Sequence, residues 1–499
     1  MNRRTRFAAA GLAAVALAGA TSAGTAMAGR ESSNNEVRNV IYLLGDGMGR
    51  THVTAARERY YGADGKLVME TLPNVGQNRT YSVEPGSGQP GESDFRPNYV
   101  TDSASAATAW TTGYKTYNAA LAVDGKGTSR ATVMELAKKA GYRTGNVSTA
   151  EITDATPAGQ MSHVLMRGCQ GPEYSAAACQ NTELTGSALP TTDIRVTPVA
   201  DQVARNGTAD VIMGGGLSRF DAADEAALKA QGYTVLGSPA DQRVATEQDL
   251  NRVRRNRRSA NKVFALYNKG NLTIERTKRE NPAGSEAKEP SVADMTRKSI
   301  ELLNTNKGGK GFYLQVEGAL IDKRSHANDA AQTLEETKAF DEAVRVALDF
   351  AKKDKHTLVI VTADHECAGF NIIEKGTYTN AEAVTPPANV DSGNKANNSV
   401  PSRAKGGALD PKRSSGIVNG AGQGDAANFG PATFRTPDDA AGVTDGSKDA
   451  SLWLSYLSGN HTGADVPVYG YGPTSQRVAG SIENTDLFTI VGQALRVVR

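Results

Sequence analysis

The sequence has little net charge, few cysteines and, beyond its first 28 residues, no long hydrophobic run. The formal net charge of the 499 residues is +2, which argues against nucleic acid or an anionic membrane as the partner. One basic run at 252–262 departs from this balance, and we interpret it as a solvated helix face or loop. No uncharged apolar segment after residue 28 is long enough to cross a membrane. The composition therefore predicts a soluble protein.

The first 28 residues have the pattern of a secretory signal peptide. Basic residues, including Arg3 and Arg4, precede the apolar stretch "FAAAGLAAVALAGA", and "AMA" at 26–28 offers a small-residue cleavage site. The arginine pair leaves a twin-arginine export route open, although the residues that follow fit that pattern poorly. We expect an exported protein, extracellular or periplasmic, that has no membrane attachment after cleavage of 1–28.

The three cysteines divide into a pair and a single residue. Cys169 and Cys179 lie in a segment rich in glycine, proline and alanine, and in an exported protein their spacing favours a local disulfide. Closing a loop of this length is worth about 3 kcal/mol in the chain-entropy model. The sequence leaves open whether Cys367 is buried and inert or an exposed thiol.

Short apolar runs alternate with helical patterns along the chain. The runs are continuously apolar, which is typical of strands buried on both faces of a parallel sheet. They lie at 39–44, 145–148, 209–215, 312–316 and 357–361. Helical patterns lie between them at 131–141, which ends on a glycine, and at 335–355. This alternation predicts an α/β fold with a doubly wound, mostly parallel central sheet flanked by helices.

Acidic residues, a threonine and a histidine follow the predicted strands. They are Asp46, Asp154, Thr156, Glu317, Asp364 and His365. One acid at a strand end means little, because aspartate is common in turns. Several together indicate a site, because open α/β sheets bind ligands at the carboxyl ends of their strands.

The span of these residues decides the expected domain organisation. Length alone favours about two or three domains. However, the residues at the predicted strand ends run from 46 to 365, so one sheet must bring them together. We therefore expect a single domain at 29–499, in which 376–450, dense in Gly, Pro, Asn, Asp and Ser, forms a long loop-rich insertion.

Three of the six histidines fit a metal site. Asp322 and His326 are four residues apart, so one helical turn would point both at one ion. His365 follows Asp364, and His461 lies in the polar stretch "SGNHTGAD". Imidazoles together with carboxylates match zinc. A histidine-free set of acids and a hydroxyl suits magnesium instead: Asp46, Thr156 and Glu317.

The stretch "NYVTDSASAATAWTTG" at 98–113 leads into a predicted helix. Ser103 could be an ordinary N-cap of that helix, which is the commoner use of a serine there. It could instead be a nucleophile at the positive end of the helix, where a phosphate is favoured, and the two roles need not exclude each other. Ser105 would lie inside the helix, turned away from the metal ligands.

Six blocks of the sequence resemble those of bacterial alkaline phosphatases and occur in the same order, from about residue 37 to the C-terminus. They are "NVIYLLGDGMG", "YVTDSASAATAWTTGYKTYN", "GNVSTAEITDATPA", "QVEGALIDKRSHA", "LVIVTADH" and "NHTG". The resemblance implies an alkaline-phosphatase-like catalytic domain. It also implies hydrolysis of small-molecule phosphate monoesters through a phosphoserine intermediate, with two zinc ions and one magnesium ion as cofactors. Members of the family are often homodimers, which leaves a homodimer open here.

The resemblance assigns a role to residues that would touch phosphate. Ser103 would be the nucleophile, and Arg167 would bind two phosphate oxygens. Asp102 would orient Arg167. Asp154 and Lys323 match positions that act on phosphate or magnesium through water. The spacing of the predicted disulfide also resembles one in the family.

The resemblance also distributes the metal ligands. One zinc would be held by Asp322, His326 and His461, and the other by Asp46, Asp364 and His365. Asp46 would also bridge to a magnesium ion held by Thr156 and Glu317. The chain departs from the family pattern in the insertion at 376–450 and in the tripeptide that contains Cys367. That cysteine raises the question of a soft ligand near zinc.

Two alternatives remain beside a phosphomonoesterase. The first is another enzyme of the same metal-dependent superfamily, a phosphodiesterase or a sulfatase. The chain shows no C/S-x-P-S-R setting for a sulfatase, and Arg167 favours a monoester, which offers it two free oxygens. The second is a secreted metal-binding or phosphate-scavenging protein without turnover, which would not need Ser103 at a helix start.

Overall fold

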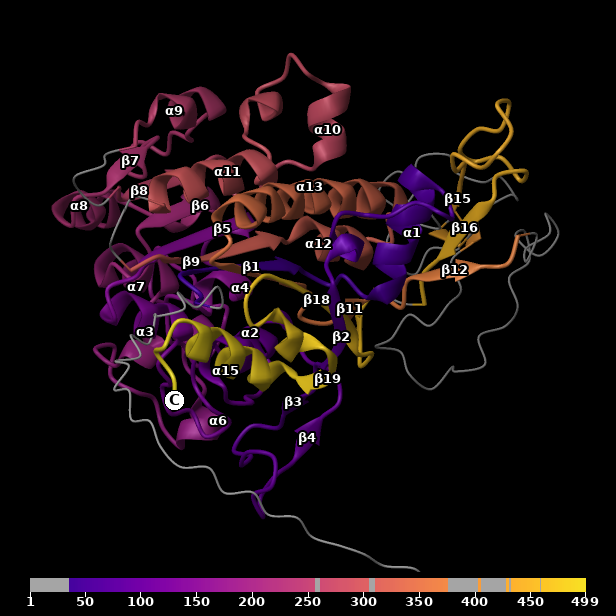
Figure 1. The fold of residues 1–499 in the computed structure, drawn as a ribbon. Helices are drawn as coiled ribbons and strands as arrows, with labels where there is room; N and C mark the ends of the chain where they lie inside the picture. The colour runs from indigo at the N-terminus through magenta and orange to yellow at the C-terminus, as the bar shows by residue number, and fades with distance from the viewer. Residues whose placement is uncertain are drawn as a thin grey trace, which may run out of the picture. The chain divides into compact units, whose positions relative to one another are not determined.

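A ten-stranded sheet forms the centre of the fold, in the order β19-β2-β18-β10-β1-β9-β5-β6-β8-β7 (Figure 1). In that order the strands are Gly480–Glu483, Asn74–Arg79, Val466–Tyr471, Thr357–Thr362, Asn39–Gly45, Phe312–Gly318, Arg143–Glu151, Val211–Gly215, Val263–Leu266 and Thr234–Leu236. Strand β18 runs antiparallel to both of its neighbours, and the remaining neighbours pair in parallel. The sheet is therefore mostly parallel, as predicted.

The computed structural model describes residues 36–255, 261–304, 310–375, 432–457 and 459–499, and the backbone at 403–404 and 428–429. The predicted signal peptide at 1–28 and most of the predicted insertion at 376–450 lie outside these residues. So do residues 256–260 of the basic run, which begins where α9 ends.

The apolar runs form the middle of the sheet because both of its faces are covered. Every residue of β1, β9 and β10 is buried. Along β1, Ile41 and Leu43 belong to one apolar core, whereas Val40, Tyr42 and Leu44 belong to the other. Side chains of a strand alternate between its two faces, so these two cores lie on opposite sides of the sheet. The α/β prediction from continuous apolar runs is confirmed.

Helices supply both layers, with α11 and α13 on one side of the sheet and α2, α3, α7 and α15 on the other (Figure 1). The helices are α1 Arg50–Tyr61, α2 Ser103–Thr112, α3 Val133–Lys139, α4 Ala155–Ala158, α5 Ala176–Cys179, α6 Thr182–Thr185, α7 Val199–Asn206, α8 Ala222–Ala230, α9 Glu247–Arg252, α10 Glu275–Glu280, α11 Val292–Leu303, α12 Leu320–His326, α13 Ala330–Asp354 and α15 Asn484–Ala494. Both predicted helices are present as α3 and α13. The C-cap of α3 is Ala140, and the predicted glycine follows it with φ +89°.

Short strands outside the main sheet complete the fold. They are β3 Ser82–Val83, β4 Pro97–Asn98, β11 Glu366–Cys367, β12 Asn371–Ile373, β13 Arg403–Ala404, β14 Asn428–Phe429, β15 Ala432–Phe434, β16 Leu452–Ser455 and β17 His461–Thr462. β15 lies within 376–450, where the composition suggested loops, yet it pairs with β16 and buries Phe434 to 3% exposure. Arg59 of α1 binds Asp445 at 2.6 Å, which ties this end of the segment to the domain.

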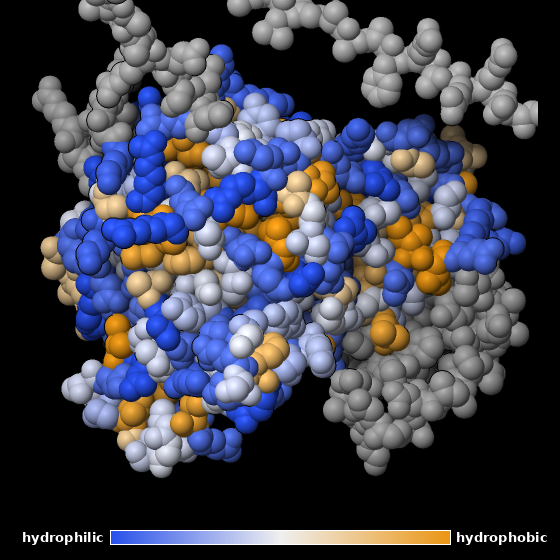
Figure 2. All heavy atoms as spheres, turned by 60° about the horizontal axis from the view of Figure 1, so that its bottom comes forward, coloured by the Kyte–Doolittle hydropathy of each residue, from blue (hydrophilic) through white to orange (hydrophobic). Residues whose placement is uncertain are grey.

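Cys169 and Cys179 form the predicted disulfide. Cys367 is fully buried, which answers the question left open by the sequence. Among the described residues no helix has the length and apolar character needed to span a bilayer. The face drawn in Figure 2 is mainly hydrophilic, with hydrophobic residues in several separate patches.

Candidate active site

The sheet topology brings the predicted acids to one edge. β10, β1, β9 and β5 are consecutive and parallel, and Leu44 is in register with both Thr362 and Glu317. Glu317 is in turn in register with Ser148 of β5. Asp46, Glu317 and Asp364 therefore follow or end neighbouring strands at the same edge. Residues far apart in sequence meet there because the strands that carry them are adjacent.

Helix α2 begins at this edge, and its N-cap is Asp102 rather than Ser103. An Asp102 carboxylate oxygen accepts the Ser105 N–H at 2.9 Å, and the backbone of Asp102 is extended. The interpretation of Ser103 as the cap is therefore wrong. Ser103 is the first residue of the helix, and its Oγ lies 3.2 Å from His365 Nε2. The hydroxyl of Ser105 contacts Asp102 and Thr101 instead.

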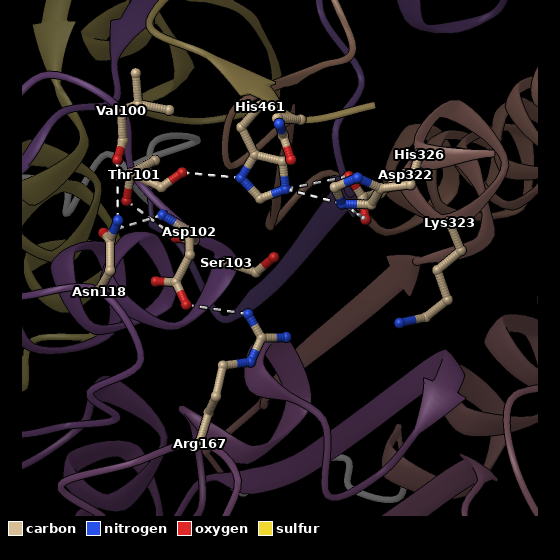
Figure 3. A pocket seen from close by; sticks show the side chains of 11 residues that line it. Val100, Thr101, Asp102, Ser103, Asn118, Arg167, Asp322, Lys323, His326 and His461 are labelled. Carbon is tan, nitrogen blue, oxygen red and sulfur yellow. Dashed lines mark hydrogen bonds and ion pairs between the residues drawn. The ribbon is translucent and has the colours of Figure 1, made fainter. Parts of the chain in front are cut away.

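A pocket of about 550 Å³ opens above Ser103 (Figure 3). Its lining includes eight of the polar or charged residues around the site: Asp102, Ser103, Asn118, Arg167, Asp322, Lys323, His326 and His461. In Figure 3 the ends of the Ser103, Arg167 and Lys323 side chains converge on the middle of this pocket. The volume leaves room for more than a phosphate group.

Two cations and two carboxylates form ion pairs beside Ser103, and all of them except Asp154 line the pocket. Arg167 binds Asp102 at 3.1 Å and Asp154 at 2.7 Å, and Lys323 binds the other Asp154 oxygen at 2.7 Å. Burial alone would raise the pKa of Asp154, but Lys323 and Arg167 hold that pKa well below its usual value. Burial would likewise lower the pKa of Arg167, but its two carboxylates raise that pKa. We call these four residues the paired wall, because each of their charges has an opposite partner.

A second group beneath Ser103 has buried polar atoms that lack a hydrogen-bond partner within the described residues. We call this group the buried ligand set. The atoms are Asp46 Oδ1, Thr156 Oγ1, Asp322 Oδ1, Asp364 Oδ2 and His365 Nδ1. We include Glu317, whose charge acts on Asp46. Burial raises the pKa of Asp46 well above its usual value, and the neighbouring Asp364, Asp322 and Glu317 add to the shift. Burial also raises the pKa of Glu317 to about 7. Buried carboxylates that repel one another need cations close by.

The histidines of α12 and β17 are oriented as metal ligands usually are. His326 Nδ1 lies 2.6 Å from the Gly459 carbonyl oxygen, and His461 Nδ1 lies 2.9 Å from the Thr101 carbonyl oxygen. Each ring can therefore donate from Nδ1 and keep a lone pair on Nε2, the arrangement typical of metal-bound histidine. The Nε2 atoms of His326 and His461 are 3.1 Å apart, and Asp322 Oδ2 lies 3.2 Å from His326 Nε2.

Two groups of side chains could each hold a metal ion. Within each group every residue offers one ligand atom, and these atoms all lie within 4.8 Å of one another. The first contains Asp322, His326, Cys367 and His461, and the second contains Asp46, Asp322 and His365. Asp364 adjoins the second group, with Oδ2 3.1 Å from His365 Nε2. Among the carboxylates predicted from sequence, Asp364 and Glu317 stand outside both groups, which consist of histidine, cysteine and carboxylate side chains and so do not cover the Thr156 hydroxyl. Glu317 accepts a hydrogen bond from the Ser148 hydroxyl, and Thr156 is the second residue of the α4 turn that Asp154 caps.

These donors fit divalent cations. Unpartnered, buried oxygen and nitrogen atoms point to a missing partner, because such atoms are otherwise hydrogen-bonded. The histidine and carboxylate donors suit zinc, whereas the carboxylate and hydroxyl donors suit magnesium.

Sequence reasoning missed Asn118. The Asn118 side chain accepts the Asp102 N–H at 3.1 Å and donates to the Val100 carbonyl at 3.0 Å, so it holds the turn before Ser103. The block "KTYN" contains it, but nothing in the residue type distinguished it. The three histidines that the sequence did not assign to metal have protein partners: His52 contacts Ser325, His163 contacts Glu135 and His356 contacts the Glu36 carbonyl.

Comparison with known proteins gives one consistent result. The family model described as alkaline phosphatase matches residues 37–497. An alkaline phosphatase from Escherichia fergusonii is 34% identical over 496 residues, which cover 93% of this chain and 88% of that protein. The crystal structure of Thermus thermophilus alkaline phosphatase superposes with a TM-score of 0.64 at 23% identity, covering 93% of this chain and 92% of that one. A TAB5 alkaline phosphatase mutant with Mg bound in its M3 site superposes with a TM-score of 0.60 at 25% identity, covering 93% and 99%.

Proposed function

The chain belongs to the alkaline phosphatase family and is a phosphatase, and on that premise we propose that it hydrolyses phosphate monoesters with Ser103 as the nucleophile. The products are an alcohol and inorganic phosphate, and the phosphoryl group resides on Ser103 between the two half-reactions. The metals would be two zinc ions and one magnesium ion. The phosphate esters are small molecules, since their alcohol part would enter a pocket of about 550 Å³.

The position of the Ser103 hydroxyl carries this proposal. It lies 3.2 Å from His365 of the buried ligand set and lines the same pocket as Arg167 and Lys323 of the paired wall. A phosphate dianion needs positive charge around it and an oxygen placed for in-line attack. Ser103 at the first position of α2 meets the second need, and the free N–H groups of the helix start favour the anion.

Arg167 and Ser103 have separate roles in the proposed reaction. The fork of Arg167 would bind two phosphate oxygens, and Asp102 and Asp154 hold that fork in place. Ser103 Oγ forms a bond to phosphorus as the ester oxygen leaves and takes a proton. Water then attacks the same phosphorus, releases phosphate and returns a proton to Ser103 Oγ. Two in-line displacements retain configuration at phosphorus.

The metal positions follow from the donors. One zinc would be held by Asp322, His326 and His461 and the other by Asp46, Asp364 and His365, while magnesium would be held by Asp46, Thr156 and Glu317. When bound, these ions would supply Lewis-acid charge and lower the pKa of the attacking oxygen. The unpartnered atoms of the buried ligand set support this assignment.

We further propose that the protein is exported by the leader at 1–28 and acts outside the cytoplasm as one catalytic domain at 29–499. The disulfide between Cys169 and Cys179 supports an oxidising compartment. A homodimer, as is frequent in the family, is compatible with this assignment. Neither nucleic acid nor membrane is required as a partner.

Ser103→Ala is the direct test of this proposal. We expect turnover of p-nitrophenyl phosphate to fall by at least about 10³-fold while bound metal is unchanged, because the variant lacks the nucleophile. Ser105→Ala on the same helix is the matched control and should stay within about tenfold of the wild type, because its hydroxyl contacts Asp102, Thr101 and Asn118 and does not line the pocket. Near-wild-type turnover by the Ser103 variant, free of contaminating phosphatase, would overturn the proposal.

A second comparison separates the alternative enzymes. The monoesterase should hydrolyse p-nitrophenyl phosphate faster than bis-p-nitrophenyl phosphate, because a diester leaves Arg167 fewer free oxygens. The reverse preference would indicate a phosphodiesterase. Release of one phosphate per protein without further cycles would indicate a scavenging protein.

A further inference from the structure

Cys367 lies beside the Asp322, His326 and His461 donors, although no role in the proposed reaction involves it. Its Sγ belongs to the group whose ligand atoms lie within 4.8 Å of one another. The residue is fully buried, and all three cysteines of the chain lie within the described residues, the other two being joined in the disulfide. The protein therefore has a single thiol, and it stands at a candidate metal position.

Strand pairing fixes the direction of the thiol. β11 and β17 pair antiparallel, with Cys367 directly opposite His461. Side chains of directly opposed residues emerge on the same face and are close neighbours. The Cys367 N–H donates to the Gly47 carbonyl at 3.1 Å, which anchors β11 beside the end of β1. The placement of the thiol thus follows from backbone pairing that is independent of side-chain conformation.

Asp322 supplies a second observation at the same place. Asp322 is 6% exposed, and its Oδ1 atom is buried without a hydrogen-bond partner in the described part of the chain. A Cβ added to Gly47 would stand 2.7 Å from Cys367 Cβ and 2.8 Å from Asp322 Oδ1, so both side chains border one spot. Gly47 has φ +67°, which favours glycine and keeps that spot free of a side chain. The Cys367 side chain and a carboxylate oxygen that lacks a hydrogen bond in the described residues therefore border a common position.

We propose that Cys367 is a ligand, as thiolate, of the metal held by Asp322, His326 and His461, and that this position therefore prefers a thiophilic divalent cation. This rests on the proposed function only in that these three residues hold a metal. As the metal binds, the thiol proton leaves to solvent and sulfur donates an electron pair to the cation. Two imidazoles, a carboxylate and a thiolate form a donor set for Zn²⁺, Co²⁺ or Cd²⁺ and exclude Mg²⁺.

The dimensions suit such a centre. Ligand atoms at ordinary zinc–nitrogen and zinc–sulfur bond lengths stand about 3.5 Å apart in a tetrahedron. The four ligand atoms lie within 4.8 Å of one another, so no pair has to close by more than about 1.3 Å. Zinc also expands to five ligands during catalysis, so a thiolate and a substrate oxygen can be accommodated together. Sγ contacts the Asp322 carbonyl oxygen at 3.7 Å, a weak interaction that a metal bond would readily exceed.

Cobalt substitution of the mature protein tests the proposal. The metal-free protein is titrated with Co²⁺ and its absorption recorded from the near ultraviolet through the visible. We expect a thiolate-to-cobalt charge-transfer band that grows with the visible ligand-field bands. Cobalt ligand-field bands without a charge-transfer band would overturn the thiolate assignment. Because the chain has one thiol, the band has a single source.

Variants at position 367 give an independent readout. Cys367→Ser keeps the size of the side chain and is expected to lose the charge-transfer band and to bind Cd²⁺ about 10–100-fold more weakly. Cys367→Ala is the second variant, in case a buried serine hydroxyl perturbs folding, and should give the same loss. Unchanged Cd²⁺ affinity in a folded variant would make Cys367 a packing residue.

Phosphatase turnover measured on the same samples separates the two proposals. Turnover by the zinc protein together with no charge-transfer band overturns the thiolate ligand and leaves the proposed function standing. Absence of both metal binding and turnover overturns the proposed function itself, and the thiolate ligand with it.

Discussion

The paired wall and the buried ligand set both adjoin Ser103, and they differ in how their charges are balanced. In the paired wall, Arg167 and Lys323 meet Asp102 and Asp154 at 2.7 to 3.1 Å, so opposite charges balance within the protein. In the buried ligand set, burial and the neighbouring carboxylates raise the pKa of Asp46, and atoms remain without hydrogen-bond partners in the described residues. The neighbouring histidines outweigh burial at Asp322 and Asp364 and lower the pKa of both carboxyls. The protein alone therefore builds the first, whereas the second needs cations from outside.

Removal of divalent cations is expected to have the largest effect. A chelator should lower monoester turnover by at least about 10³-fold, because the ions supply several kcal/mol of charge stabilisation. The measurement is turnover with metal content, before and after chelation and again after zinc and magnesium are returned. The paired wall should survive, so the metal-free protein should remain folded. Full turnover in protein shown to be metal-free would contradict the claim that the buried ligand set needs cations.

Arg167→Ala probes the paired wall and is expected to lower kcat/KM by about 10²–10³-fold, because two directed hydrogen bonds to phosphate are lost. Arg167→Lys keeps the charge without the fork and should give an intermediate loss. Metal content should not change in either variant. Arg219→Ala is the control, since Arg219 binds Glu151 at 3.0 Å at a partly exposed position and does not line the pocket. Equal kcat/KM for Arg167→Ala and wild type would show that the guanidinium does not bind phosphate in the reaction.

Asp102 has two tasks that a pair of variants can separate. Asp102→Asn should still cap α2, since asparagine caps as well as aspartate, but it loses the charge that holds Arg167. Asp102→Ala loses both. We expect each variant to lower kcat/KM by about tenfold and only Asp102→Ala to lower the free energy of unfolding, by about 1 kcal/mol. If the asparagine variant kept full kcat/KM, the ion pair would have no part in orienting Arg167.

Glu336 of α13 offers a buried carboxyl outside the candidate site, and it sharpens the comparison without any expected effect on turnover. It accepts the Glu275 N–H at 2.7 Å, and burial with the nearby Glu275 raises its pKa from 4.5 to about 8. Between these values the folded state binds a proton that the unfolded state has lost. Stability should therefore fall as pH rises through this window, by up to about 1.4 kcal/mol per pH unit.

Urea unfolding at several pH values measures this effect. Glu336→Gln should flatten the dependence of unfolding free energy on pH and stabilise the protein at the alkaline end, and a chelator should leave the difference between variant and wild type unchanged. An identical pH slope in both proteins would show that the Glu336 carboxyl titrates normally in the folded state.

Much of the central sheet and the set of candidate ligands could be predicted from sequence, because both depend on local pattern. Continuous apolar runs mark strands covered on both faces, and an acid directly after such a run lies at the sheet edge. β1 with Asp46 and β10 with Asp364 illustrate this. The helical spacing of Asp322 and His326 likewise placed both on one face of α12.

The remaining features depend on backbone conformation or on distant pairing. Asp102 and Ser103 are equally good caps by residue type, and only the extended backbone of Asp102 decides between them. Cys367 lies opposite His461 because β11 pairs with β17 across a long stretch of chain. β15 lies in a segment of loop-like composition, and its pairing with β16 stabilises it.

The most direct test of the account is to locate the phosphoryl group during turnover. The protein is mixed with a phosphate monoester, quenched in acid and digested, and the phosphorylated peptide is identified by mass spectrometry. The account predicts phosphoserine at Ser103, on the peptide that begins helix α2, and none at Ser105. Phosphate on another residue, or steady turnover with inversion of configuration and no phosphoprotein, would contradict it.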